Sequence, residues 1–203
     1  MSPRPVNRRR SPPGLLQQRL SHARGVLPGV LITLLVVWVP SLYALNDHNL
    51  IYAMALIPRS VQGINGILTM PMVHGSMEHL LVNSSLLAIF AAVLLWRGYR
   101  YYLAATLMIA LVAGSALWLV GRTGAHIGAS MLIFGFFGLL ATRGLFERQF
   151  LSIAVSLAVV GVYSGLLWGI IPEDEAMSWE GHLLGLLVGV LTARLLSPKV
   201  YRR

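Results

Sequence analysis

The chain has 203 residues, of which 56% are hydrophobic and only 11% are charged. Ordinary globular domains carry about 25% charged residues, so this composition is typical of a chain that lies in a lipid bilayer. The lack of cysteine excludes disulfides, thiolate catalysis and cysteine-based zinc sites. A net charge of +9 favours nucleic-acid binding only if the basic residues form one patch. Instead they gather at the ends of apolar segments, which indicates membrane topology and predicts no nucleic-acid partner.

Residues 1–25 contain many arginines and no acidic residue. This composition predicts a disordered basic cytoplasmic tail that contacts anionic headgroups. The following apolar run, residues 26–45, is long enough to span a bilayer, which takes about 20 helical residues. A cleaved signal peptide is disfavoured because the basic region is long and no small-x-small site follows the run.

Proline and glycine interrupt residues 46–77, which we expect to form a loop lying partly in the membrane interface. Five further apolar runs follow, at residues 79–96, 101–120, 129–146, 150–171 and 182–197. We therefore predict an all-α integral membrane protein whose six transmembrane helices form one bundle over residues 26–198. Residues 199–203 would be a short cytoplasmic tail.

The loop charges predict how this bundle is oriented. All basic residues except Arg59 and Arg122 fall on the side of the two termini, and all acidic residues except Glu147 fall on the opposite side. The positive-inside rule therefore places both termini in the cytoplasm. We expect a multi-pass protein of a bacterial cytoplasmic (inner) membrane.

In this orientation the second, fourth and sixth spans begin at the same depth, near the outer face. Polar residues open each of these spans, at residues 74–83, 128–130 and 178–182. Polar groups within spans usually face the bundle interior or a wet cavity, so we expect one shared site.

Helical spacing predicts which of these polar residues lie on the same face of a helix. His79 and Asn83 are four residues apart and share a face. Ser130 shares a face with Phe134, and His182 lies beside a stripe of small residues that permits close helix approach. If the faces of the fourth and sixth spans meet, the Ser130 hydroxyl reaches the His182 imidazole and Phe134 packs on its ring.

These residues resemble the rhomboid family of intramembrane serine proteases over roughly residues 42–197. The resemblance depends on three motifs: His74-x4-His79-x3-Asn83, Gly128-x-Ser130, and Gly181-His182-x2-Gly185-x3-Gly189. It implies that Ser130 is the nucleophile and His182 the general base. It also implies that His79 and Asn83 form an oxyanion hole with the Ser130 backbone N–H, and that Phe134 stacks on the base. Gly128, Gly181, Gly185 and Gly189 would support the site.

The chain departs from the family pattern at two places. Met131 follows the serine where the family usually has glycine, and it is expected to reshape the substrate cavity or weaken activity. Many relatives carry Trp-Arg in the first loop, whereas this chain has Ile57-Pro58-Arg59 and no tryptophan there.

Each of these residues also has a purely structural interpretation. Ser130 could be a helix-start residue, since caps favour serine. His182, His79 and Asn83 could make hydrogen bonds between helices or to a loop. We interpret His74 as structural, through bonds to loop backbone, and leave open whether His126 shapes the cavity or caps its loop.

Together these features predict a serine endopeptidase with a Ser130–His182 dyad that cleaves single-span membrane proteins near the outer face of the bilayer. No cofactor or metal is expected, because His74, Glu78 and His79 lack the His-Glu-x-x-His order of a zinc protease. The alternatives are a catalytically inactive rhomboid-like protein that binds membrane clients and, more weakly, a small channel or transporter. Substrate identity and oligomeric state are left open.

Overall fold

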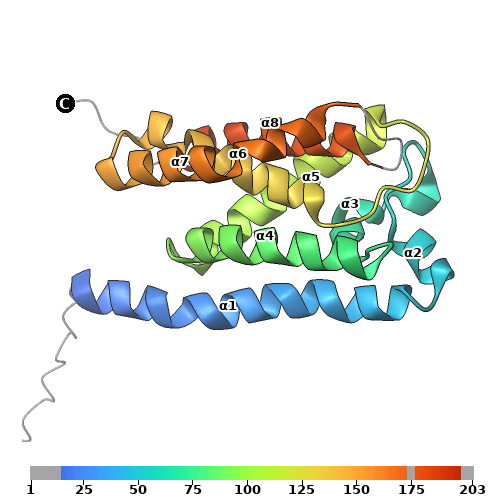
Figure 1. The fold of residues 1–203 in the computed structure, drawn as a ribbon, viewed down its shortest axis with the longest axis horizontal. Coiled ribbons are helices and arrows are strands. Elements are labelled where there is room, and N and C mark those ends of the chain that lie inside the picture. The colour runs from blue at the N-terminus through green and yellow to red at the C-terminus, as the bar shows by residue number, and fades with distance from the viewer. Residues whose placement is uncertain (1–14, 173–176, 198–203) are drawn as a thin grey trace, which may run out of the picture.

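A computed structural model describes residues 15–172 and 177–197 and shows a bundle of helices (Figure 1). Six of its helical segments are long and apolar enough to cross a membrane, which confirms the six predicted spans. The long helices are α1 (Leu15–Ala44), α4 (Met77–Leu95), α5 (Tyr99–Val120), α6 (Ser130–Glu147), α7 (Phe150–Tyr163) and α8 (Trp179–Leu196). A 3-10 segment, η3 (Ser164–Ile170), continues α7. The described residues contain no strand beyond one isolated bridge between Leu56 and His126.

The beginning of α1 corrects one expectation. The predicted disordered tail over residues 1–25 is wrong for residues 15–25, which belong to the helix. These residues are mostly leucine, glutamine, arginine and alanine, which are good helix formers, and the first proline of α1 is Pro28. Residues 1–14, the acidic run Glu173–Asp174–Glu175 and the tail at 199–203 lie outside the described residues.

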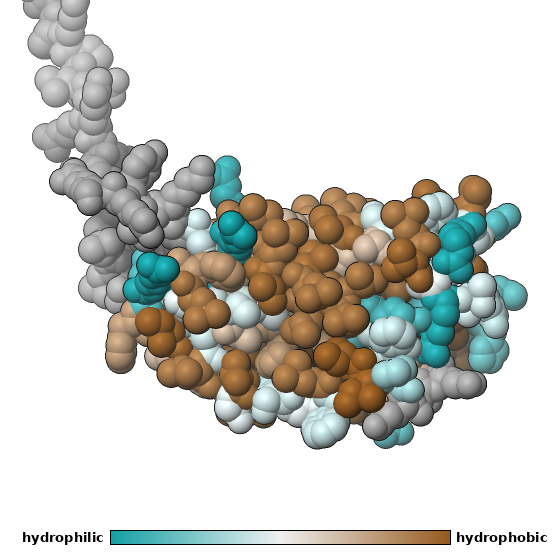
Figure 2. All heavy atoms as spheres, turned by 90° about the horizontal axis from the view of Figure 1, so that it is seen from above, coloured by the Kyte–Doolittle hydropathy of each residue, from teal (hydrophilic) through white to brown (hydrophobic). Residues whose placement is uncertain are grey.

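The surface of the bundle is apolar over its middle. Figure 2 shows hydrophobic side chains covering the centre of one face, with hydrophilic side chains gathered toward its two ends. Only 17% of the apolar segments of α1 and of α7 is buried within the protein. The bundle is therefore a multi-pass membrane domain, and the side to which each end faces remains a prediction from the loop charges.

Helix α6 is the centre of the bundle, with 72% of its residues buried. It packs against α4, α5, α7 and α8, and its contact with α8 is the most extensive. Glycines make this contact close: a Cβ atom on Gly185 would lie 2.2 Å from the Met131 carbonyl oxygen, and one on Gly189 would lie 2.0 Å from the Gly135 oxygen. These two members of the predicted small-residue stripe therefore bring the backbones of α6 and α8 together. The third, Gly181, faces Ser178 and Leu117 instead.

The loop between α1 and α4 folds into short helical pieces that are held at the end of the bundle where α5 stops. These pieces are α2 (His48–Met54), η1 (Val61–Gly63), α3 (Gly66–Thr69) and η2 (Met70–Met72). Arg59 donates from Nη1 to the carbonyl oxygen of Gly121 at 2.8 Å. Trp118 of α5 donates from its indole to the Ser60 carbonyl at 3.0 Å. An indole from α5 thus holds a loop that carries no tryptophan of its own.

The close contact of α6 and α8 predicts that Gly189→Ala destabilises the bundle, because its methyl group would collide with backbone that cannot rotate away. Overpacking of this kind costs about 1–3 kcal/mol. Unfolding of the purified protein in mixed detergent micelles measures the loss. Gly161→Ala in α7 is the matched control, since a Cβ atom there meets nothing within 4 Å. Equal stability of the two variants would contradict the packing argument.

Candidate active site

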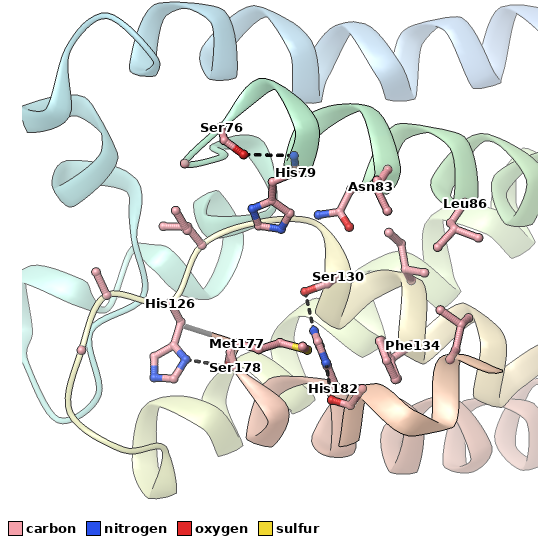
Figure 3. Close-up of a pocket in the computed structure, with 18 of the residues that line it drawn as sticks. Ser76, His79, Asn83, Leu86, His126, Ser130, Phe134, Met177, Ser178 and His182 are labelled. Carbon is pink, nitrogen blue, oxygen red and sulfur yellow. Dashed lines mark hydrogen bonds between the residues drawn. The ribbon is translucent and has the colours of Figure 1, made fainter. Parts of the chain in front are cut away.

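The first turns of α4, α6 and α8 meet around one cavity of about 700 Å³ (Figure 3). These turns lie toward the end of the bundle opposite the start of α1 (Figure 1). Ser130, His182, His79, Asn83 and Phe134 all line this cavity. The expectation that three polar span beginnings share one site is therefore confirmed as a matter of position.

Ser130 and His182 are in direct contact. Ser130 is the first residue of α6, and its Oγ lies 2.9 Å from Nε2 of His182 in α8. The ring of Phe134, one turn along α6, stacks on the imidazole with centroids 4.1 Å apart and planes 4° from parallel. The expected meeting of these two helix faces is confirmed.

The backbone at Gly169 decides which nitrogen of His182 carries the proton. Nδ1 of His182 lies 2.7 Å from the Gly169 carbonyl oxygen, which can only accept a hydrogen bond. Nδ1 is therefore the protonated nitrogen, and Nε2 keeps the lone pair that can accept the Ser130 hydroxyl proton. The carbonyl orients the ring as a carboxylate does in a catalytic triad.

The sequence interpretation missed Gly169, because a backbone carbonyl leaves no side-chain signature. The available signal is the spacing of Gly161, Gly165 and Gly169, which repeats every four residues in the fifth span. A Cβ atom on Gly169 would lie 2.9 Å from Phe134 Cζ and 3.3 Å from His182 Nδ1. Glycine here is thus required by the close approach of η3 to the stacked pair.

His79 and Asn83 lie against the backbone just before Ser130. Gly128 has φ +98°, and a Cβ atom on it would lie 2.7 Å from His79 Cε1 and 3.3 Å from Asn83 Nδ2. Glycine at this position tolerates the positive φ and leaves room for the side chains of His79 and Asn83. The N–H of Ser130, at the first position of α6, has no partner within the helix. Donor groups from α4 and α6 therefore face the same part of the cavity.

A buried network fixes the orientation of the Asn83 amide. His74 is fully buried, and its Nε2 accepts from the Ala129 N–H at 3.3 Å. The Asn83 group that lies 3.0 Å from the same nitrogen must therefore be the donor, Nδ2. Nδ1 of His74 accordingly donates to Ser41 Oγ at 2.9 Å, and Ser41 donates to the Met72 carbonyl at 3.0 Å. The predicted bond from His74 to loop backbone is confirmed. The second N–H of Asn83 has no hydrogen-bond acceptor among the described residues, and Asn83 lines the cavity.

His126 connects the loop before α6 to the beginning of α8. Its Nε2 donates to the Arg122 carbonyl at 3.1 Å, and its Nδ1 accepts from Ser178 Oγ at 2.6 Å. It also lines the cavity, so the two interpretations left open for it both hold. Glu180 is engaged elsewhere: its Oε1 lies 3.2 Å from Arg122 Nε in an ion pair. Its carboxylate therefore orients Arg122, not His182.

Met131 does not reshape the cavity, which corrects that expectation. Its side chain is 1% exposed, belongs to the apolar core and is absent from the cavity wall. Residue 131 follows Ser130 by about 100° around the helix, so its side chain points away from the face that carries the hydroxyl. Over the ranges that the structure describes, no three histidine, aspartate or glutamate side chains are placed to hold a metal ion.

Comparisons with known proteins agree with this architecture. A family model described as the Rhomboid domain matches residues 62–199. An uncharacterized protein of Mycobacterium tuberculosis and one of Mycobacterium bovis are each 36% identical to the chain over 149 residues, which is 69% of this chain and 62% of the relative. An uncharacterized protein of Mycobacterium leprae is 36% identical over 141 residues, or 65% of this chain and 56% of the relative. The chain thus matches less than two thirds of the length of these relatives.

The burial of His74 predicts that acid destabilises the fold through this residue. Burial, with a smaller effect of His79, lowers the pKa of His74 from 6.5 to about 3. Between these values the unfolded chain binds the extra proton, so stability is complete above pH 6.5 and falls as the pH falls toward 3. At pH 4.5 the loss attributable to His74 is at most about 3 kcal/mol.

Unfolding in mixed micelles at pH 7 and pH 4.5 measures this loss. His74→Gln, which does not titrate, should lose less stability between the two pH values than the unsubstituted protein. His48→Gln is the control, because His48 is exposed in α2. Identical pH dependence in the unsubstituted protein and His74→Gln would exclude His74 as the acid-sensitive group.

Proposed function

The chain belongs to the rhomboid family, whose members are usually intramembrane serine proteases, and we propose that it is a serine endopeptidase that cleaves single-span membrane proteins near the outer face of the bilayer. The contact that carries the proposal is the 2.9 Å approach of Ser130 Oγ to His182 Nε2. A nucleophile and a base must lie within about 2.6–3.2 Å for proton transfer, and this pair meets that distance.

The reaction begins with attack of Ser130 Oγ on a peptide carbonyl carbon. His182 Nε2 takes the hydroxyl proton, and the carbonyl oxygen becomes the oxyanion of a tetrahedral intermediate. When the intermediate collapses, the C–N bond breaks and His182 returns the proton to the leaving amine. Water then attacks the acyl-enzyme and loses its proton to Nε2. The bond between the acyl carbon and Ser130 Oγ breaks, His182 returns the proton to Oγ, and the second product leaves as a carboxylic acid.

Three donors are candidates for holding the oxyanion: the Ser130 N–H, the free N–H of Asn83 Nδ2, and the ring of His79. Preorganised donors of this kind act strongly in a site shielded from water, and each is worth about 10²–10³ in kcat. The His74 network supports this role because it turns the donor end of Asn83, not its oxygen, toward Gly128.

The imidazolium that forms on His182 needs no carboxylate in this arrangement. The Gly169 carbonyl accepts from Nδ1 before and after proton transfer, and the stacked Phe134 ring prevents the imidazole from rotating. A substrate helix must unwind before its backbone can reach Ser130, since helical carbonyls are already bonded. A small or helix-breaking residue near the cleavage site would ease that unwinding.

Covalent labelling with a serine-directed fluorophosphonate tests the proposal on the full chain in detergent. Labelling should be lost in Ser130→Ala and fall by about 10³-fold or more in His182→Ala. Ser85→Ala is the control, because this serine is exposed on α4 and bonds only the Leu81 carbonyl of its own helix. A folded but unlabelled protein would instead support a catalytically inactive, client-binding member of the family.

Gly169→Ala tests the orienting carbonyl. The added methyl group must displace Phe134 or His182, and a misplacement of about 1 Å costs on the order of 10²-fold in rate. We expect the labelling rate to fall by about 10-fold to 100-fold, while Gly161→Ala, in the preceding helix α7 with open space around it, labels normally. Unchanged labelling in Gly169→Ala would show that the ring is held in another way.

A further inference from the structure

A second cavity, of about 570 Å³, lies at the other end of the bundle from Ser130. Helix α6 separates the two sites by roughly 25 Å, from Ser130 at its first residue to Glu147 at its last. Residues of α1, α4, α6 and α7 line it, and its polar and aromatic side chains include Trp96, Arg97, Arg143 and Ser152. The proposed protease reaction uses none of these residues.

Two guanidinium groups, of Arg97 and Arg143, line this cavity, and the buried carboxylate of Glu147 lies beside them. Arg97 Nη1 lies 2.6 Å from both oxygens of Glu147 and forms a close ion pair. Ser152 also donates to Glu147 Oε2. Arg143 reaches the same oxygen only at 3.5 Å, although its side chain is just 6% exposed. The cluster therefore keeps one positive charge without a close counter-ion.

Arg143 is the member of this cluster whose hydrogen-bond donors are incompletely paired. Its Nη2 makes a further long contact of 3.4 Å with Ser152 Oγ, and its Nε is buried with no hydrogen-bond partner among the described residues. A buried guanidinium whose contacts are long and incomplete is costly in a membrane protein. Arg143 lines the cavity, so an anion with several acceptor oxygens bound there would lie beside its guanidinium and balance the remaining charge.

The rest of the wall is apolar and is placed at the depth of the headgroups. Val26, Ala92, Val93, Leu151 and Val155 supply a hydrocarbon surface next to the two arginines. Trp96 is 54% exposed at the end of α4, and exposed tryptophan marks a membrane–water interface. Helices α4 and α7 both pack against α6 but make little contact with each other, so the cavity lies at a gap that faces lipid.

We propose that this cavity binds an anionic glycerophospholipid, with its phosphate on Arg143 and Arg97 and an acyl chain along the apolar wall between α4 and α7. A free phosphate would not use the apolar wall. A single-span protein helix carries basic residues at its cytoplasmic flank, which the two arginines would repel. The lipid belongs to the leaflet at the basic end of the bundle, which is the cytoplasmic one under the orientation predicted from the loops.

Native mass spectrometry of the full chain, released from detergent with phosphatidylglycerol or phosphatidylcholine of the same acyl chains, tests this site. We expect one retained phosphatidylglycerol and no matching phosphatidylcholine. Arg143→Gln should weaken retention by about fivefold to tenfold, the effect of removing one arginine near a headgroup. Arg100→Gln is the matched control, because Arg100 is exposed at the same end and does not line the cavity.

A second variant keeps the test independent of how well Arg143→Gln folds. Val155→Trp fills space beside the apolar wall and keeps both arginines, and it should also reduce phosphatidylglycerol retention by fivefold or more. Equal retention of both lipids would overturn the proposal, as would an equal loss in Arg100→Gln or no loss in either cavity variant. Displacement of the lipid by inorganic phosphate would identify a simple anion site instead. Displacement by a model single-span peptide with a basic flank would identify a protein-binding gap.

Discussion

The close approach of α6 to α8 determines whether this protein has a site at all. Ser130 and His182 belong to different helices, and only the passage of Gly185 and Gly189 over the carbonyls of Met131 and Gly135 brings their side chains within hydrogen-bond distance. A larger residue at either glycine would move the helices apart by more than the hydroxyl could span. In a bilayer, where apolar side chains gain little by leaving lipid, such backbone-to-backbone packing is a main source of helix association. The same contact therefore holds the fold together and sets the distance between the two groups.

Backbone carbonyls and N–H groups fix the tautomers and orientations of the side chains in this site. The Gly169 carbonyl fixes the tautomer of His182, and the Ala129 N–H fixes that of His74, which in turn orients Asn83. A backbone carbonyl can only accept a hydrogen bond and a backbone N–H can only donate one. Each therefore fixes which nitrogen of its histidine carries the proton, whereas a hydroxyl could play either role. The result is a site whose proton positions follow from the fold, with a backbone carbonyl and not a carboxylate bonded to Nδ1 of the base.

The two ends of the bundle have different chemistry. At one end, neutral polar groups surround Ser130, and the charged residues Arg122 and Glu180 pair with each other. The other end has more arginine than acid, and Arg143 in its cavity makes only a long ion pair of 3.5 Å with Glu147 among the described residues. This asymmetry is the folded counterpart of the charge bias in the loops. It suits a protein that would act on peptide bonds at one membrane surface while being held by anionic lipid at the other.

The sequence by itself determined the six spans, the common depth of the three polar clusters, and the face on which Ser130, Phe134, His79 and Asn83 lie. These features depend on hydropathy and helical period, which are local and leave a clear pattern in the chain.

Only the tertiary structure decided the rest. Spacing cannot show that the Gly169 carbonyl reaches His182, that His74 turns Asn83, or that Met131 points into the core, since each depends on which helices touch and how closely. The sequence also did not show that α1 begins before residue 26. An arginine-rich composition indicates a solvated tail, but arginine is also a good helix former, so composition alone does not distinguish the two. The physical reason is general: periodicity assigns a side chain to a face of its own helix, whereas its partner is set by packing between helices distant in sequence.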